Sequence, residues 1–487
     1  MELDPGQCFA ALRARDARFD GRFFVGVTST GIYCRPVCSA RVPRREHCTF
    51  HRSAAAAEAA GFRPCLRCRP ELAPGLSAVD AQARLARHAA RLLEALPRAG
   101  GGIQTVAQRL GVSPRHLRRA FGAAFGVAPV AFAQTQRLLL AKRLLTDTTL
   151  PVTEVALASG FGSLRRFHAL FRTRYRLSPT ALRQGLLSTA PADAMDFELA
   201  YRPPYDWARQ LAFLRDRSLT EVESVQDGAY RRSLLIEAGV QRHTGWFEVR
   251  PVPERALLAV RVSATLVPVL TAVLARVKHL FDTDGDPLAV AAALGPLATP
   301  RPGLRLPGAV DGFEVLVRAV LGQQVTVRAA RTLARRFVEA FGEPLQTPFA
   351  DINRLFPAPQ RIAAQSRDAI AALGIIGRRA DTLRAAAAAV AAGELDLRPD
   401  APVEATLVRL RALPGVGDWT AQYVAMRALA WPDAFPAADH GVMKALGVSR
   451  PRDAAARAHH WRPWRAYAVM HLWHSLDSQE TTPCTTT

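Results

Sequence analysis

Lysine is scarce in this sequence, and acidic residues are outnumbered by arginine. The 487 residues include 64 lysines and arginines but 42 aspartates and glutamates, a net charge of +22 at pH 7. Only three of the basic residues are lysines. Because heavy arginine use can reflect a GC-rich genome, the total charge does not by itself indicate a polyanionic partner. The hydrophobic fraction of 49% is ordinary for soluble folded proteins and excludes wholesale disorder.

Signals for membranes and secretion are also lacking. No stretch of 18 or more uncharged apolar residues is present, so we expect no membrane span. The start, residues 1–5, has neither the basic nor the apolar region of a secretory signal. The seven cysteines are odd in number and mostly clustered, which favours metal or catalytic use in a reducing compartment over a disulfide framework. We therefore expect a cytoplasmic protein without a membrane partner.

The excess of positive charge is gathered in one segment. Residues 76–190 carry 17 basic and 4 acidic residues, a net +13. The segments 1–75, 191–310 and 311–487 carry net charges of +5, 0 and +4. More than half of the excess thus lies in less than a quarter of the chain, which predicts a dedicated module that binds a polyanion.

The length predicts three or four domains. Pro- and Gly-bearing stretches mark three candidate boundaries, at residues 69–75, 188–193 and 300–308. The stretch 300–308 could instead be a rigid connection inside one domain. The first segment has strand-like runs and is expected to be a small α+β domain, and residues 80–185 are expected to be helical. Residues 196–300 mix strand-like and helical runs, and the chain from Asp311 onward is expected to be helical. The Ala-rich runs 54–60 and 385–392 are predicted to be helices.

Four cysteines have the spacing of a metal site. Cys34 and Cys38 are followed, after 26 intervening residues, by Cys65 and Cys68. Two such pairs can place four thiolates tetrahedrally around one Zn²⁺, which would also help to hold together a domain with little core. A purely structural zinc site is the commoner outcome for this ligand set. The remaining thiols are expected to be ordinary ones: Cys8, Cys48 and Cys484.

The residues around these cysteines favour a reactive zinc site over a purely structural one. The stretches 30–38 and 61–68 resemble the N-terminal domain of the Ada methyl-acceptor proteins. The resemblance implies that Cys34 accepts the methyl group of a methylphosphotriester in DNA, once per chain. A zinc-bound thiolate is nucleophilic at neutral pH. Its methylation removes one negative charge, which should strengthen attraction to phosphates and could act as a damage switch.

The basic segment contains an internal repeat. Residues 106–121 resemble residues 155–171, and each unit has a helix, a glycine turn and a short helix. Ser113 suits an N-cap and Pro114 the first helical position. The second helices carry the arginines expected to contact DNA: Arg115, Arg118, Arg119, Arg165 and Arg166. The pair resembles the AraC-type DNA-binding domain, and a helical bundle whose arginines are merely solvated is the alternative.

A second kind of DNA-binding element lies near the C-terminus. Residues 410–421 contain Leu-Pro-Gly-x-Gly between two helical runs, in which Gly415 and Gly417 would let backbone amides approach a phosphate. A plain turn between helices is the alternative. Residues of about 196 to 475 resemble the AlkA-type 3-methyladenine DNA glycosylases of the helix-hairpin-helix superfamily, most clearly in four stretches: 201–207, 301–308, 318–324 and 461–467. The resemblance places residues 300–308 inside the glycosylase.

The resemblance to the glycosylases implies a catalytic residue. It identifies Asp439, which in isolation would be a cap or turn residue. A carboxylate there stabilises the oxocarbenium charge that develops when an N-glycosidic bond breaks, or it orients water. Relatives that also cleave the strand carry a lysine where this chain has Trp419. Without that amine no Schiff base forms, which predicts monofunctional hydrolysis that leaves an abasic site.

The resemblance also implies a pocket for the flipped base. Phe213, Trp419, Tyr423 and Trp473 match its aromatic residues, which would attract the positive charge of an alkylated purine. Trp419 and Tyr423 are one helical turn apart, which suits one wall. Two positions depart from the family. Gln324 stands where a relative can have an apolar DNA wedge, and His440 replaces an aromatic residue, which could alter base preference.

Together these features predict a multidomain chain. The expected domains are a zinc methyl-acceptor domain (1–75), an all-α double helix-turn-helix domain (80–185), an AlkA-like α+β domain (195–305) and an all-α helix-hairpin-helix domain (306–478). The expected functions are excision of alkylated bases from double-stranded DNA, methyl acceptance at zinc, and regulation of transcription at promoters. RNA polymerase is a possible partner in that regulation. We expect a bacterial, nucleoid-associated monomer. The alternative is a methylation-sensing activator whose glycosylase half only binds DNA.

Overall fold

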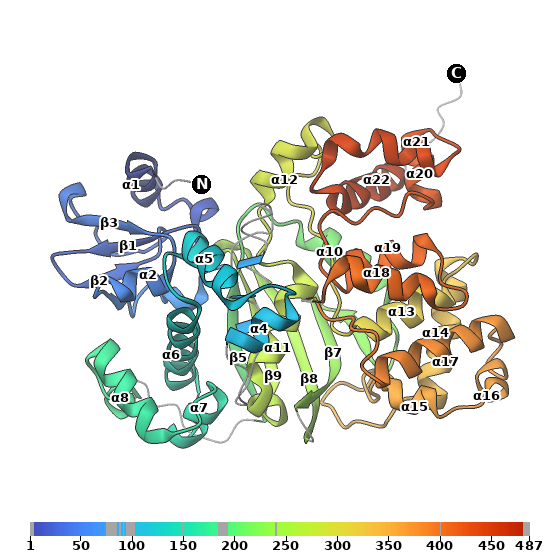
Figure 1. Cartoon of the computed structure of the whole chain (residues 1–487), viewed down its shortest axis with the longest axis horizontal. Coiled ribbons are helices and arrows are strands. Elements are labelled where there is room, and N and C mark those ends of the chain that lie inside the picture. Colours follow the sequence, from blue (N-terminus) through green and yellow to red (C-terminus); the bar gives the residue numbers. More distant parts are fainter. Residues whose placement is uncertain are drawn as a thin grey trace. The chain divides into compact units, whose positions relative to one another are not determined.

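Figure 1 shows a computed structural model of the chain. The structure describes residues 4–74, 85–86, 89–90, 92–93, 103–148, 150–183, 193–238, 241–399 and 401–480. Gly75 of the predicted boundary 69–75, residues 188–192 of the predicted boundary 188–193, and Cys484 lie outside these residues. The chain divides into two compact units. The first comprises Met1–Pro203, Leu235–Lys278 and Thr283–Gly285, and the second comprises Pro204–Leu234, His279–Asp282 and Asp286–Thr487.

The first unit begins with a small α+β region. Its elements are α1 (Pro5–Ala14), β1 (Phe24–Val27), β2 (Ile32–Cys34), β3 (Cys48–His51), α2 (Ala54–Ala59) and β4 (Arg63–Pro64). The strand order is β3-β1-β2-β4, with only β2 and β4 parallel. Because side chains alternate along a strand, Val25 packs with Leu12 of α1, whereas Phe24 packs with Ala57 of α2. The expected α+β class and the helix at residues 54–60 are confirmed.

The basic segment folds as two helix-turn-helix units that share a long helix. The helices are α4 (Ile103–Arg109), α5 (Pro114–Phe125), α6 (Pro129–Asp147), α7 (Val152–Ala158), α8 (Leu164–Tyr175) and α9 (Pro179–Arg183). Ser113 accepts a hydrogen bond from the His116 amide, and Pro114 occupies the first turn, as predicted. Ser163 caps α8 in the same way. The equivalent residues Phe121 and Phe171 are both buried, so the repeat persists in three dimensions.

Charged side chains join the small α+β region to α6. Lys142 is 1% exposed and donates to both carboxylate oxygens of Glu71, at 2.6 and 2.7 Å. Arg69 donates to both oxygens of Asp147, at 2.7 and 2.6 Å. Thr135 of α6 donates to the buried carboxylate of Glu58 in α2. The two regions therefore share a polar, largely dry interface inside the first unit.

A five-stranded sheet follows, in the order β5-β9-β8-β7-β6. Its strands are β5 (Ala194–Ala200), β6 (Glu223–Gln226), β7 (Ala229–Ala238), β8 (Gln241–Val252) and β9 (Leu257–Ser263), and β7 continues from the second unit into the first. The 3₁₀ segment η5 (Ala264–Val269) packs on β8 and β9 and leads into α11 (Leu270–Phe281). In the described chain this stretch, Ala264–Phe281, is the one helix whose length and composition could cross a membrane. Half of it is buried, as in core helices of soluble proteins, and Arg276 near its end donates to the Leu235 carbonyl.

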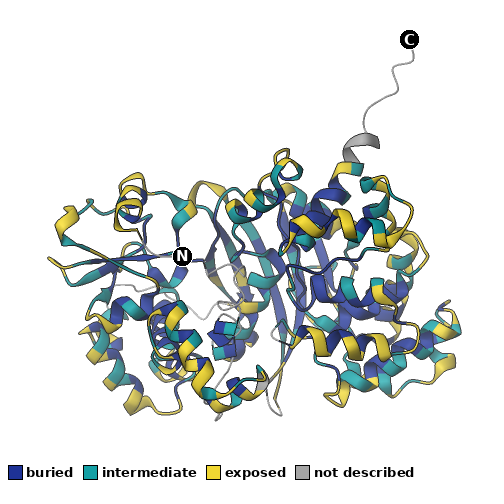
Figure 2. Cartoon of the chain, turned by 45° about the horizontal axis from the view of Figure 1, so that its top comes forward, coloured by how far each residue is buried: buried dark blue, intermediate teal, exposed yellow. Residues whose placement is uncertain are grey.

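The second unit is mainly helical. Its helices are α10 (Trp207–Arg217), α12 (Pro287–Leu294), α13 (Gly312–Leu321), α14 (Val327–Phe341), α15 (Pro359–Ala363), α16 (Arg367–Ala371), α17 (Gly377–Ala391), α18 (Val403–Ala412), α19 (Asp418–Arg427), α20 (His440–Leu446), α21 (Pro451–Arg457) and α22 (Arg465–Glu480). The apolar helix α13 contacts both α17 and α19 and forms the centre of the unit. Figure 2 shows the helices buried on their inner faces and exposed on their outer ones. The helix expected at residues 385–392 is confirmed as the end of α17.

Candidate functional site

The four predicted cysteines come together. The sulfur atoms of Cys34, Cys38, Cys65 and Cys68 all lie within 4.8 Å of one another. Sulfurs placed about 2.3 Å from a tetrahedral Zn²⁺ are roughly 3.8 Å apart, so this donor set fits the ion with small adjustments. Four soft sulfur ligands in this arrangement favour zinc over hard oxygen-preferring ions. The cluster therefore fits Zn²⁺, as the spacing predicts.

Two cysteines of this cluster are partly exposed. Cys34, which ends β2, and Cys68 have intermediate exposure, whereas Cys38 and Cys65 are buried. Beside Cys34, the buried Arg35 forms an ion pair with Asp20 and donates from Nη1 to the Cys68 carbonyl at 3.0 Å. These contacts fix the Cys-Arg-Pro turn relative to the second cysteine pair. Arg35 thereby links the segment that carries Cys34 to the segment that carries Cys68.

The five predicted arginines of the helix-turn-helix region are all exposed. They lie on the second helix of each unit: Arg115, Arg118 and Arg119 on α5, and Arg165 and Arg166 on α8. The sequence reading missed Arg137 of α6, a half-buried side chain whose Nε has no hydrogen-bond partner within the described chain. Burial lowers the pKa of Arg137, and the neighbouring charge of Arg166 lowers it further. Like charges this close favour an anionic ligand such as a phosphate.

The hairpin between α18 and α19 has the predicted form. Gly415 has φ +79°, a left-handed conformation, and a Cβ there would lie 2.4 Å from the Thr382 hydroxyl oxygen. That hydroxyl donates to the Pro414 carbonyl at 2.8 Å, and Gln323 donates to the Gly415 carbonyl at 3.0 Å. Gly417 is exposed and caps α19. The loop therefore presents exposed backbone at the start of a helix, where a phosphate can bind.

Asp439 lies at the N-terminus of α20, beside this hairpin helix. Its Oδ1 accepts hydrogen bonds from the Val442 amide and the Trp473 indole, each at 2.9 Å. Its Oδ2 accepts a hydrogen bond from the Trp419 indole, also at 2.9 Å. Asp439 thus caps α20, as expected for an isolated aspartate in such a loop. It is also the centre of a hydrogen-bond network that joins α19, α20 and α22. Three N–H donors hold a half-buried carboxylate in one orientation.

The structure brings the predicted aromatic residues to the same carboxylate. Trp419 and Tyr423 stack with ring centroids 5.4 Å apart, and Phe213 and Trp473 lie nearly parallel at 6.4 Å. Each pair contains one tryptophan whose indole N–H donates a hydrogen bond to Asp439. Trp461 and Trp464, by contrast, are buried as core residues. The aromatic residues from α10, α19 and α22 therefore form one cluster around the carboxylate.

Two arginines of this cluster were missed from the sequence. Arg217 lies 3.9 Å from the ring centre of Phe213, and Arg427 lies 4.8 Å from it. Arg427 also donates to the Tyr423 hydroxyl at 2.9 Å. Each arginine follows a predicted pocket residue by four positions on the same helix. That spacing was the available signal, since side chains four apart on a helix are neighbours.

The two positions that depart from the family are exposed. Gln324 follows α13 with φ +53°, a left-handed conformation that is uncommon for a residue with a side chain. His440 is the first residue of α20 and lies next to Asp439. Neither side chain is buried in the core, so both are available to a ligand.

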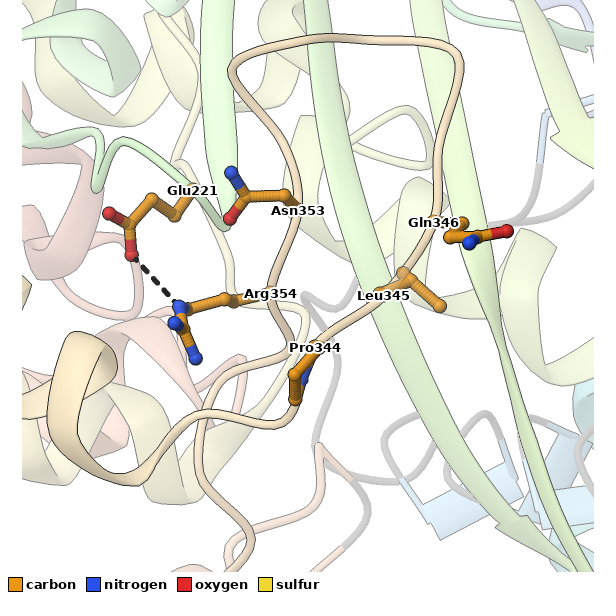
Figure 3. Close-up of a pocket in the computed structure, with 6 residues that line it drawn as sticks. All are labelled: Glu221, Pro344, Leu345, Gln346, Asn353 and Arg354. Atoms are coloured by element: carbon orange, nitrogen blue, oxygen red, sulfur yellow. Dashed lines mark ion pairs between the residues drawn. The ribbon is translucent and has the colours of Figure 1, made fainter.

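A surface pocket of about 420 Å³ lies elsewhere in the second unit. Figure 3 shows its six lining residues, with an ion pair of 3.5 Å between Glu221 and Arg354. The others are Pro344, Leu345, Gln346 and Asn353. None of the six is a predicted site residue, and the pocket has no nucleophile or metal-ligating cluster, so we assign it no role.

Models of known protein families match most of the chain. Four family models match: the metal binding domain of Ada (residues 7–71), a helix-turn-helix domain (106–185), the AlkA N-terminal domain (196–311) and the HhH-GPD superfamily base excision DNA repair protein (317–465). A Mycobacterium tuberculosis protein named "Probable bifunctional transcriptional activator/DNA repair enzyme AlkA" is 37% identical and covers 98% of this chain and 97% of its own. The chain belongs to this family of bifunctional activator and repair proteins.

Two further relatives refine the comparison. DNA-3-methyladenine glycosylase 2 of Escherichia coli is 39% identical over 57% of this chain and 97% of its own length. A solved 3-methyladenine DNA-glycosylase from Archaeoglobus fulgidus superposes with a TM-score of 0.51 at 18% identity, over 59% of this chain and all of that one. The latter shows the fold alone. The predicted multidomain fold class, the three resemblances and the zinc assignment are confirmed for this member of the family.

Proposed function

We propose that the second unit is a DNA glycosylase that removes alkylated bases such as 3-methyladenine. One observation carries the proposal: the fixed carboxylate of Asp439 lies among four aromatic side chains. Aromatic faces bind a base taken out of the DNA stack. The exposed hairpin at Gly415 and Gly417 provides a contact for the phosphate backbone.

Asp439 acts on the sugar. As the bond between C1′ and the base nitrogen breaks, positive charge develops on the sugar ring, and a carboxylate beside it stabilises that charge. The two indole donors keep the carboxylate from rotating away, which preserves its position for the transition state. Water then adds to C1′ and loses its proton to the carboxylate or to solvent.

The test is release of 3-methyladenine from methylated duplex DNA by the wild type and by Asp439→Asn. Asn keeps the size of the side chain and its ability to cap α20 but removes the charge. We expect release to fall by at least a hundredfold, the loss typical of removing one preorganised electrostatic group. Asp453→Asn, an exposed carboxylate on α21, is the matched control and should leave release unchanged. Equal release by Asp439→Asn would refute its role. Release by neither protein would favour the alternative, an activator whose glycosylase half only binds DNA.

We propose that the reaction is monofunctional. Trp419 stands where strand-cleaving relatives have a lysine, and its indole is committed to Asp439. The described glycosylase unit has no amine in this cluster that could form a Schiff base with the sugar. Borohydride should therefore trap no covalent complex between protein and DNA. Trapping of such a complex would contradict the assignment.

We propose that Cys34 accepts methyl groups from DNA methylphosphotriesters. Bound zinc keeps a cysteine sulfur deprotonated and nucleophilic at neutral pH. The Cys34 sulfur attacks the methyl carbon, the carbon–oxygen bond breaks, and its electron pair stays on the phosphate oxygen. Because a thioether is not readily reversed, one methyl group is taken up per chain.

Methyl transfer is tested with DNA that carries labelled methylphosphotriesters. We expect one methyl group per chain for the wild type and for Cys48→Ala, whose thiol lies outside the cluster. Cys34→Ala should accept none. Transfer that survives Cys34→Ala, or a protein purified without zinc that still transfers, would rule out this account.

We propose that the helix-turn-helix region binds promoter DNA and that methylation of Cys34 strengthens the binding. The exposed arginines of α5 and α8 support the contact with DNA. We place the protein in the bacterial cytoplasm, on the nucleoid, as a monomer that contacts RNA polymerase when it activates transcription. Sedimentation of the protein with promoter DNA, with and without RNA polymerase, tests the stoichiometry and the contact. A dimer, or no faster-sedimenting complex when RNA polymerase is added, would contradict these last two points.

A further inference from the structure

The sheet of the AlkA-like domain ends in a strand that other regions of the first unit cover. Strand β5 lies at one end of the sheet and pairs with β9 along its whole length. The long helix α6 of the helix-turn-helix region and the 3₁₀ segment η3 (Pro70–Leu72) of the zinc region, residues 4–74, also contact β5. An uncovered edge strand leaves backbone groups unpaired and open to other chains. The described residues up to Arg183, the regulatory half of the chain, therefore meet the sheet at its edge strand.

Arg143 of α6 is buried against this strand. It is 4% exposed, and its Nη2 donates to the Glu198 carbonyl of β5 at 2.8 Å. Its guanidinium lies 5.1 Å from the centre of the Phe197 ring, which is also buried on β5. A cation over an aromatic face and a hydrogen bond from a charged donor both favour this position. A charged residue of the helix-turn-helix region thus has partners on a strand of the glycosylase.

The charges near Arg143 do not replace that contact. Asp147, about one turn further along α6, lies 3.7 Å from the Nε of Arg143, which is longer than a hydrogen bond. Both oxygens of Asp147 accept hydrogen bonds from Arg69 instead. Burial lowers the pKa of Arg143 to about 10, although the charge of Asp147 opposes the shift. Burying this arginine is therefore costly, and the Glu198 carbonyl offsets part of that cost.

A second arginine connects the zinc region to the segment after β5. Arg202 is 1% exposed and donates to the Asp284 carbonyl at 2.9 Å and to the Pro74 carbonyl at 3.4 Å. Gly21 lies beside them with φ +72°, and a Cβ there would be 2.0 Å from the Pro74 oxygen and 3.2 Å from Nη2 of Arg202. Helix α7 also contacts η5, which packs on β8 and β9. The zinc region and the helix-turn-helix region therefore both contact the sheet domain.

We propose that β5 is the docking surface for the regulatory half of this chain, with Arg143 as its anchor. The zinc region and the helix-turn-helix region are held on the α+β domain of the glycosylase as one body. The methyl acceptor, the promoter-binding helices and this sheet therefore move together and not as independent modules joined by the peptide chain alone. The inference goes beyond the reactions proposed above and does not depend on either of them.

Helix α6 is the shared element of this arrangement. Its Lys142 pairs with Glu71 of the zinc region, and its Asp147 pairs with Arg69 of the same region. Arg143, which lies between them in the sequence, contacts β5 instead. Three charged residues within about two turns of one helix therefore bind two other regions. Breaking either contact would leave buried charged groups without their partners, so the three regions are held together more firmly than exposed ion pairs would hold them.

Loss of the Arg143 contact should weaken the association of the two halves measurably. Removing a hydrogen bond from a charged donor weakens an association by roughly tenfold to a hundredfold. In Arg143→Met the carboxylate of Asp147 keeps Arg69 as its partner, so α6 is not left with an uncompensated charge. Arg143→Lys keeps a positive charge near Asp147 but lacks the planar group that donates to Glu198. We therefore expect a smaller loss for this variant.

The experiment cuts the full chain between the two halves. A recognition site for a sequence-specific protease is inserted after Ala190, outside the described residues, and the purified protein is cleaved there. Sedimentation over a dilution series then gives the dissociation constant of the two fragments. Arg255→Met is the matched control, because Arg255 binds the carboxylate of the same Glu198 but lies on the same fragment as Glu198. Hydrogen exchange of the uncut variants checks that α5 and α8 remain folded.

We expect the cleaved wild type to sediment as one complex. Arg143→Met should raise the dissociation constant roughly tenfold to a hundredfold, Arg143→Lys by a smaller factor, and Arg255→Met not at all. Wild-type fragments that separate at micromolar concentration would overturn the docking surface. Unchanged association in both Arg143 variants, or an equal loss with Arg255→Met, would overturn the role of Arg143. If Arg143→Met also unfolds α5 or α8, Arg143→Lys decides the outcome. These results do not depend on base release, whose failure would instead refute the proposed glycosylase.

Discussion

Replacement of Lys142 by methionine should destabilise the first unit strongly. Lys142 is 1% exposed and Glu71 has a side chain that is 2% exposed, with the shortest contact at 2.6 Å. Removal of one partner from a buried pair costs about 3–5 kcal/mol, because the other charge is left uncompensated. Arg69 also contacts Glu71, at 3.3 Å, and would compensate part of it. We therefore expect about 3 kcal/mol, the lower end of that range.

The assay is scanning calorimetry of the full chain, which monitors the unfolding transition of the first unit. For a unit of this size, about 3 kcal/mol corresponds to a fall of roughly 6–12 °C in Tm. Arg44→Met is the matched control, because the Arg44–Glu46 pair is 4.0 Å long and mostly exposed. It should shift Tm by less than 2 °C.

A double variant separates the pair from its surroundings. Lys142→Met combined with Glu71→Gln leaves no unpaired charge at this position, so its loss of stability should be smaller than the sum of the two single losses. If Lys142→Met costs less than about 1 kcal/mol, or if the losses add, the pair behaves like an exposed one and the reasoning from burial is wrong.

Three further predictions concern other described residues. Gly415→Ala should lower stability by about 1–2 kcal/mol, because its φ is +79° and the new Cβ would meet Thr382, while Gly417→Ala, with φ −86° and open space, should be tolerated in unfolding assays. Burial raises the pKa of Glu58 to about 7 from 4.5, so the folded state holds its proton more tightly. Stability should then fall as pH rises from about 4.5 to 7, by up to about 3 kcal/mol, and Glu58→Gln should abolish that slope in pH-dependent melting. Arg137→Gln should reduce the salt slope of promoter binding by about one without changing sequence preference, and an unchanged slope would exclude a phosphate contact.

Much of the architecture could be predicted because its signals are local. A helix cap such as Ser113 followed by Pro114 depends only on the neighbouring backbone, so the start of α5 could be predicted from the sequence. The paired cysteines are likewise close in sequence, and two close pairs have few ways to share one ion. The hairpin glycines are needed wherever such a turn occurs.

The arrangement around Asp439 could be predicted from the sequence only in part. The carboxylate and its aromatic neighbours could be named by resemblance, but nothing in the spacing shows that Trp419 and Trp473 hold its two oxygens. Those tryptophans lie 20 and 34 residues away from Asp439 in the chain. Which groups meet over such separations depends on how α19, α20 and α22 pack.

The sequence by itself determined the modules of this protein: a four-cysteine zinc region, a doubled helix-turn-helix and a glycosylase with a hairpin. Short-range patterns are enough for that, because caps, turns and metal pairs are set within a few residues. Only the tertiary structure decided which charges are paired. Arg318 finds Glu223 and Glu314, whereas Arg217 and Arg427 find neutral groups beside an aromatic cluster. Net charge cannot distinguish these cases, because the energy of a charge depends on its burial and its nearest partners.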